Sequence, residues 1–259
     1  MKRGSEYKTF LSWFKFQKEM VGFVGIERER FLTTVEDGIF VPRAKDFLSA
    51  INNSRWTYEL SACQVEDRTN PLKDTQEIKK ALHENDCRGQ TIAKQLGLCL
   101  RTVEAVKDGM PLAVYPDPRY LRIKSEVTRE CLSAACRVAA THLHFGMPDI
   151  DTAIQVANLL RKHLKFLCGI GDHSNGERLQ LYKTMALCWM PPHYRDEKHF
   201  FEVACKEGFV ENPRDCWHLI RISIHGTVEL RMFGVTEDLD EICAWIRIVR
   251  EIIAQATNF

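Results

Sequence analysis

The segment 21–31, with the sequence VGFVGIERERF, constrains the fold more than any other part of the chain. It begins with apolar residues and then places Glu27 and Glu29 two positions apart. Because side chains alternate between the two faces of a β-strand, a strand here puts both carboxylates on one face and Arg28 and Arg30 on the other. Two glutamates on one face repel each other unless a cation, a basic partner or shared protons offset their charge. The alternative is a solvated edge strand whose charges face water.

Another extended segment, 56–69, carries two more glutamates. Glu59 and Glu66 are separated by an odd number of positions, so a regular strand would place them on opposite faces. A bulge or bend near residues 61–62 would bring them to the same face. Otherwise one of the two is a surface residue.

Two later segments repeat the spacing of two. His142 and His144 precede a Gly-x-Pro-Asp turn, and Glu229 and Arg231 follow the turn at His225. A lone histidine on a strand is more often a hydrogen-bonded core residue than a ligand. Two histidines on one strand face favour a functional site.

Helices are expected where apolar residues recur at helical spacing after a capping residue. The pattern predicts helices over 42–51, from Asp74 to about Asn85, over 151–167, over 196–208, and from Asp238 onwards. Residues 1–20 are predicted to form an N-terminal helix or arm. Residues 177–189 are expected to be extended or mixed.

The composition excludes several classes of protein. The formal net charge of +1 disfavours a nucleic-acid or membrane partner. The sequence contains no apolar run long enough to span a membrane and no signal peptide. The ten cysteines form no CxxC pair, which favours reduced thiols in a cytoplasmic protein.

One segment supports a different function. Residues 91–108 contain TIAKQLGLCLRTVEAV, which resembles the helix-turn-helix of bacterial response regulators and would make the chain a nucleic-acid-binding regulatory protein. The competing interpretation is a helix that ends near Gly97, a strand from Leu98 to about Val106, and then a loop. We favour the second interpretation, because several prolines and Gly109 follow at once.

The remaining motifs occur in an order that resembles the glutamate–cysteine ligase family, in its bacterial carboxylate–amine ligase form. They are GIERERF at 25–31, ELSACQVE at 59–66, THLHFGMPD at 141–149, SN at 174–175 and GTVELR at 226–231. The last motif and the residues after it also resemble the amidoligases. The resemblance implies an α+β fold, in which a curved, mainly antiparallel sheet forms a funnel with helices packed outside, as in glutamine synthetase. Residues 21–259 would form one catalytic domain.

The resemblance also implies the chemistry. It indicates an ATP-dependent ligase that joins a small-molecule carboxylate, such as an amino acid, to an amine through an acyl phosphate. Mg²⁺, with Mn²⁺ as an alternative, would be held by Glu27, Glu29, Glu59, Glu66, His142 and Glu229. Arg231, Glu29 and Glu229 would act in catalysis. Candidates for binding substrate are Arg119, Tyr120, His144, Tyr182, Lys183 and Arg221.

The chain is shorter than typical members of that family between the SN motif and the final strand. The substrates therefore need not be glutamate and cysteine. A degenerate ligase that binds nucleotide without turnover is a further alternative. Association between copies of the chain also stays open.

Overall fold

The computed structural model describes residues 2–107 and 109–255. Residues 1, 108 and 256–259 lie outside the described part. With them lie the first residue of the expected arm, the last residue of the helix-turn-helix-like segment, and the end of the expected catalytic domain.

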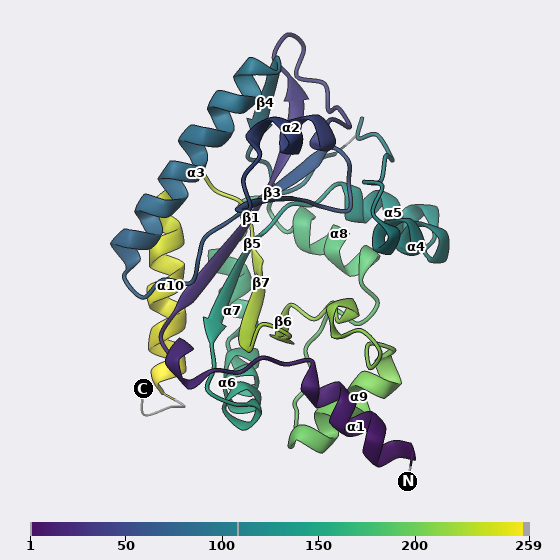
Figure 1. The fold of residues 1–259 in the computed structure, drawn as a ribbon, viewed down its shortest axis with the longest axis vertical. Helices are drawn as coiled ribbons and strands as arrows, with labels where there is room; N and C mark the ends of the chain where they lie inside the picture. Colours follow the sequence, from purple (N-terminus) through teal and green to yellow (C-terminus); the bar gives the residue numbers. More distant parts are fainter. Residues whose placement is uncertain (1, 108, 256–259) are drawn as a thin grey trace.

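Strand β1 (Val24–Thr34) is the centre of a seven-stranded sheet (Figure 1). The strand order is β2–β3–β1–β5–β7–β6, and β4 pairs with the C-terminal end of β1. These strands are β2 (Trp56–Tyr58), β3 (Gln64–Arg68), β4 (Leu98–Arg101), β5 (Thr141–Gly146), β6 (Ile220–Ser223) and β7 (Thr227–Phe233). Every pairing between them is antiparallel. The sheet is open, because β2 and β6 are its two edges.

Helices surround the sheet, which confirms the predicted α+β class with a mainly antiparallel sheet. They are α1 (Lys2–Ser12), α2 (Ala44–Ile51), α3 (Thr75–Gln95), α4 (Pro118–Glu126), α5 (Arg129–Cys136), α6 (Ile150–Lys162), α7 (Leu164–Ile170), α8 (Glu177–Met185), α9 (Glu197–Glu207) and α10 (Leu239–Ala254). Helices α3 and α10 run side by side along one flank, and α4, α5 and α8 lie together on the other (Figure 1). None of the helices in the described part combines the length and the apolar character that a bilayer span requires.

The back face of β1 is held by a buried ionic network, on the side that was predicted for its arginines. Nη2 of Arg28 lies 2.8 Å from Asp67 of β3 and 3.0 Å from Asp86 of α3. Arg30 pairs with the same Asp86 at 2.7 Å, and the Asn85 amide donates to Asp67 at 2.9 Å. Because these charges are buried, they must be paired and hydrogen-bonded. The network ties β1 and β3 to α3, and leaves Glu27 and Glu29 on the front face.

Several of the predicted elements differ from the structure. Helix α3 continues past Asn85 to Gln95. The prediction ended it too early because its buried side there is made by Asn85 and by Gly89, which lies against the ring of Trp56, and neither residue continues the apolar pattern. The helix expected over 151–167 is interrupted at His163.

Residues 177–185 form helix α8, so the expectation of an extended or mixed segment over 177–189 is wrong for these nine residues. Two of the side chains buried along it are Arg178 and Tyr182, at positions i and i+4. These two share one side of a helix, but neither belongs to an apolar stripe. The segment therefore lacks the apolar pattern from which helices are usually recognised.

The helix-turn-helix alternative is wrong. Helix α3 ends at Gln95, and Gly97 follows with a φ of 69°. Residues 98–101 then pair with residues 31–34 of β1. Residues 102–107 contain no helix, so the recognition helix that DNA binding requires is absent from the described residues. The strand expected in this place is present but ends at Arg101.

The N-terminal segment before β1 passes close to the end of the sheet. Helix α1 packs on α9, with the rings of Phe10 and Phe200 5.2 Å apart. The N–H of Lys15 then donates to the carbonyl of Ile224 at 2.9 Å. A side chain on Gly226 would lie 2.3 Å from the Lys15 carbonyl, so only glycine allows this approach.

Candidate active site

The front face of the sheet brings together the acidic and imidazole side chains of four strands. Glu27 of β1 lies opposite His142 of β5, and Glu29 lies opposite Glu66 of β3. On the other side of β5, His144 lies opposite Glu229 of β7. These side chains are buried or nearly so. The period of two in the sequence therefore places them on one face.

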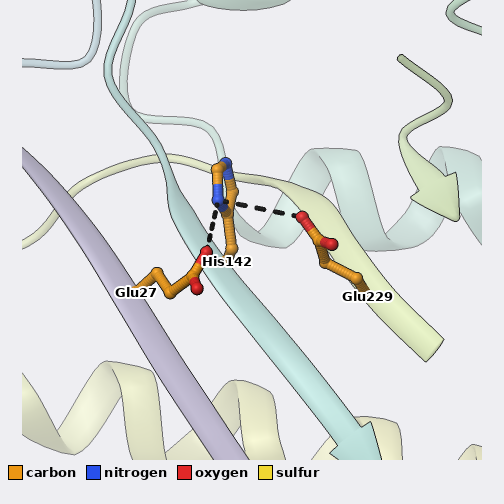
Figure 2. A group of neighbouring side chains, drawn as sticks. All are labelled: Glu27, His142 and Glu229. Atoms are coloured by element: carbon orange, nitrogen blue, oxygen red, sulfur yellow. Dashed lines mark ion pairs between the residues drawn. The ribbon is translucent and has the colours of Figure 1, made fainter. Parts of the chain in front are cut away.

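His142 lies between the carboxylates of Glu27 and Glu229 (Figure 2). Its Nδ1 atom is 3.5 Å from Oε2 of Glu27 and 4.0 Å from Oε1 of Glu229, and its Nε2 atom is 3.6 Å from Glu29. Nε2 of His144 is 3.2 Å from Glu27 and 3.8 Å from Glu229. Glu27 and Glu229 thus approach both histidines.

Glu229 is also the partner of two arginines. Nε of Arg221 lies 2.6 Å from one of its oxygens, and Nη1 of Arg231 lies 2.5 Å from the other. Nε of Arg231 also donates to the hydroxyl of Tyr182 at 3.3 Å, and that hydroxyl donates to the carbonyl of Trp217 at 2.9 Å. These contacts fix the guanidinium of Arg231 at the wall of the site.

Glu59 reaches the same site although its spacing to Glu66 is odd. The segment expected as one bent strand is two strands, because β2 ends at Tyr58 and the chain turns before β3 begins at Gln64. Glu59 lies in this turn, where its Oε2 accepts from the hydroxyl of Tyr120 at 3.4 Å. A reversal of the chain, and not a bulge within one strand, removes the difficulty with the register.

The charges of the site divide into two groups. Burial raises the pKa of Glu29 to about 8, with Glu59 adding to the rise and Arg231 opposing it. Burial and the charges of Glu27 and Glu59 likewise raise the pKa of Glu66 well above its ordinary range. On this side of the site the carboxylates are not neutralised by the residues around them.

The other side of the site favours ionised carboxylates. Burial alone would raise the pKa of Glu27, but His144 and His142 outweigh it and hold the pKa well below the ordinary range. Burial opposes the ionisation of Glu229 in the same way, and Arg221 and His144 outweigh it, so its pKa is also low. Burial and the positive charge of Arg231 lower the pKa of His142 to about 4, so its imidazole is neutral at pH 7.

The donor atoms suit a divalent cation. Two sets of three ligand atoms lie within 4.8 Å of one another, from Glu27, His142 and Glu229 and from Glu29, Glu66 and His142. Nδ1 of His142 and Nε2 of His144 are buried and make no hydrogen bond to any residue that the structure describes. Carboxylate oxygens are the ligands that Mg²⁺ prefers, and a neutral imidazole can complete such a set. The residues present therefore fit a metal ion, which would also offset the repulsion between Glu29 and Glu66.

A cavity of about 200 Å³ opens onto this face, and we call it the acidic cavity. Most of the predicted site residues line it: Glu27, Glu29, Glu59, Glu66, Arg119, Tyr120, His142, His144, Tyr182, Arg221 and Arg231. Glu229 lies fully buried beneath it. Arg119 is already paired with Asp215 at 3.2 Å. Lys183 does not line this cavity, because α8 turns it away and its Nζ atom lies 4.6 Å from the ring of Trp189.

Sequence reasoning missed several residues that line the acidic cavity, among them Arg68, Arg178, Trp217 and His225. Arg178 is 2% exposed, and its guanidinium donates to the carbonyls of Arg231 (3.5 Å) and Met232. Its spacing of four from Tyr182 is the signal that could have revealed it, had the segment been assigned as a helix.

The fold belongs to a class seen in solved structures. The bifunctional glutathione synthetase of Pasteurella multocida aligns with a TM-score of 0.61 and 13% identity, over 96% of this chain and 41% of that chain. The chain thus spans less than half of that protein. An open antiparallel sheet flanked by helices is the architecture that the two share.

Sequence comparisons identify the relatives. No family model matches the chain. A provisionally named glutamate–cysteine ligase 2 of Gloeobacter violaceus is 22% identical over 258 residues, covering 91% of this chain and 68% of the relative. Another, of Rhodococcus jostii, is 24% identical and covers 90% and 67%. The glutamate–cysteine ligase of Natronomonas pharaonis is 28% identical over 129 residues, covering 44% and 36%. The predicted resemblance to the glutamate–cysteine ligases is confirmed.

Proposed function

We propose that the chain is an ATP- and Mg²⁺-dependent ligase that joins a carboxylate to an amine. The observation that carries the proposal is the convergence of Glu27, Glu29, Glu66 and Glu229 with His142 on one buried sheet face. Buried like charges cost free energy and persist where they serve a function. The names of the relatives support a ligase and suggest amino acids as substrates.

The proposed reaction has two steps. An oxygen of the substrate carboxylate attacks the γ-phosphorus of ATP, ADP leaves, and an acyl phosphate forms. The amine nitrogen then attacks the acyl carbon, phosphate leaves, and the nitrogen loses a proton as the amide forms. Protein groups contribute to such phosphoryl transfers mainly by positioning and by electrostatic stabilisation.

The side chains divide this work. Glu27, Glu229 and His142 would hold one Mg²⁺, and Glu29 and Glu66 would hold another without the histidine, because a neutral imidazole has only one nitrogen free to bind a metal. Glu59 lies near them in the turn before β3. When bound, the metal would neutralise phosphate charge. Arg231 would stabilise the negative charge on the transferred phosphoryl group through its planar guanidinium.

Substrate binding is assigned to the rest of the lining. Arg221, Tyr182, Tyr120 and His144 border the acidic cavity and would contact the reactants, and Arg119 would do so from its pair with Asp215. We do not assign Lys183 to this site. A single catalytic domain and a cytoplasmic location are part of the same proposal.

The test is Mg²⁺-dependent release of ADP, screened over pools of amino acids and amines. We expect one carboxylate–amine pair to stimulate release, EDTA to abolish it, and Glu29→Gln to remove it. Glu36→Gln is the matched control, because Glu36 is an exposed glutamate shortly after β1. Thermal stabilisation by ATP and Mg²⁺ without turnover would indicate the degenerate ligase. Neither turnover nor nucleotide binding would refute the proposal.

A further inference from the structure

A second cavity, of about 540 Å³, lies apart from the carboxylate cluster. It is bordered by α6, α7 and α8, by the loops 171–176 and 189–190, and by Met232 of β7. We call it the basic cavity. Its volume lies in the range of small-molecule pockets, roughly 300–1,000 Å³. It contains none of the proposed metal ligands, and its function is unexplained by the ligase chemistry.

The floor of the basic cavity is apolar. Leu164 and Met232 are buried there, and Leu179 and Trp189 are half-buried. The side chain of Met190 lies at the border and is 46% exposed. Such a lining of aliphatic, aromatic and thioether groups suits a ligand with an apolar body, and methionine adapts to its shape.

The border of the same cavity is positively charged. Arg161, Lys162 and Lys165 lie along it and are exposed, and Arg178 lines it from within. None of these four cations forms an ion pair with a carboxylate of residues 2–107 or 109–255. Asp172 is the one acid among the described residues of the lining, and it accepts hydrogen bonds within its own loop from Ser174 and Gly176.

Arg178 gives the cavity a polar end. It is 2% exposed, and in the described part its guanidinium donates hydrogen bonds to two backbone carbonyls, those of Arg231 and Met232. Burial lowers the pKa of Arg178, and the charges of Glu104 and Glu29 oppose this effect. No carboxylate of the described residues contacts the guanidinium directly, so it can pair with a bound anion where little water screens the interaction. Lys183 adds a further cation nearby, with its Nζ atom 4.6 Å from the ring of Trp189.

We propose that the basic cavity binds an organic anion with an aromatic or aliphatic body. The body packs on Trp189, Leu179 and Met232, and the anionic group pairs with Lys162 and Lys165 at the border or with the buried Arg178. Because Arg178 lines both cavities, this site adjoins the wall of the acidic cavity. The site is separate from the carboxylate cluster, so the proposal does not depend on ligase activity.

Isothermal titration calorimetry of the full chain with 1-naphthoate tests the proposal, with the uncharged 1-naphthamide as the comparison. We expect saturable binding of one naphthoate per chain, and much weaker binding of the amide. The double variant Lys162→Ala, Lys165→Ala should weaken naphthoate binding roughly three- to tenfold. Lys45→Ala with Lys80→Ala is the matched control, since both are exposed helix lysines and remove the same charge.

A second pair of variants tests the cavity border without removing a cation. Met190→Glu places a carboxylate there and should weaken naphthoate binding at least threefold relative to Met190→Gln, which has the same length and no charge. Met190 is half-exposed, so both variants should fold. Absence of saturable binding, equal binding of naphthoate and naphthamide, or identical affinities in all variants would overturn the proposal.

Discussion

Replacing Glu29 by glutamine should stabilise the metal-free protein, and the gain should grow with pH. Burial, reinforced by Glu59, raises the pKa of the Glu29 carboxyl from 4.5 to about 8. Between these two pH values the folded chain holds a proton that the unfolded chain has lost. The contribution of this group to stability is therefore fully present below pH 4.5 and is lost as pH rises through 8.

The magnitude follows from the same pKa values. At about 1.4 kcal/mol for each pKa unit, the difference between 4.5 and about 8 amounts to about 5 kcal/mol in alkaline solution. Glutamine also weakens the bond that the Ala140 N–H donates to Glu29 at 2.8 Å, at a cost of about 1–2 kcal/mol. Because the pKa of Glu66 is raised as well, part of the proton binding in the folded site belongs to Glu66, and Glu29→Gln removes only the remainder of the effect. We expect a net gain of about 2–3 kcal/mol, or roughly 5–10 °C in Tm for a chain of this size.

Thermal and urea denaturation in EDTA at pH 5 and pH 9 measures this gain. The free energy of unfolding of Glu29→Gln should exceed that of the wild type at pH 9, and should equal it or fall below it at pH 5. The control Glu36→Gln should have the same stability as the wild type at both pH values. Mg²⁺ should then stabilise the wild type, because it binds the folded state, and should do so much less for Glu29→Gln. A variant that is less stable than the wild type at pH 9, or a gain that is equal at both pH values, would refute the reasoning.

Two further substitutions test the structure around the site. Glu229→Gln should lower the free energy of unfolding by about 3–5 kcal/mol in urea denaturation, because it leaves the guanidiniums of Arg221 and Arg231 without their carboxylate; a loss under about 1 kcal/mol would contradict this. Gly226→Ala should be destabilised by about 1–3 kcal/mol more than Gly38→Ala in thermal denaturation. Both glycines have positive φ, 71° and 68°, but only the first lies against a backbone carbonyl, so equal losses would exclude the close approach as the cause.

The sequence is most informative where charged residues alternate with a period of two. Glu27 and Glu29, His142 and His144, and Glu229 and Arg231 are placed on the front face of one sheet, as their spacing predicts. Alternation is a local property of a strand, so it can be read without knowing the partner strands. The spacing does not reveal which strands pair with one another. That these side chains form one site was implied only by the resemblance to a family.

Other parts of the site depend on contacts that no local pattern records. Helix α8 buries Arg178 and Tyr182 toward the acidic cavity, so its inner side is polar and gives no helical signal. Lys183 is adjacent in sequence to Tyr182, yet a rotation of about 100° between successive residues of a helix points it elsewhere. The odd spacing of Glu59 could be resolved only by seeing that the chain reverses before β3.

The two faces of β1 explain how the site can hold unneutralised carboxylates. Glu29 and Glu66 lie opposite each other on paired strands, and their raised pKa values show that the apo site resists two negative charges there. Where both carboxyls are ionised, their repulsion would favour separation of β1 from β3. On the back face Arg28 bridges Asp67 of β3 and Asp86 of α3, so separating the strands would also break a buried ionic network. The alternation of glutamate and arginine along one strand therefore combines a repulsive front face with an attractive back face, which would keep the carboxylates in place for the proposed cation.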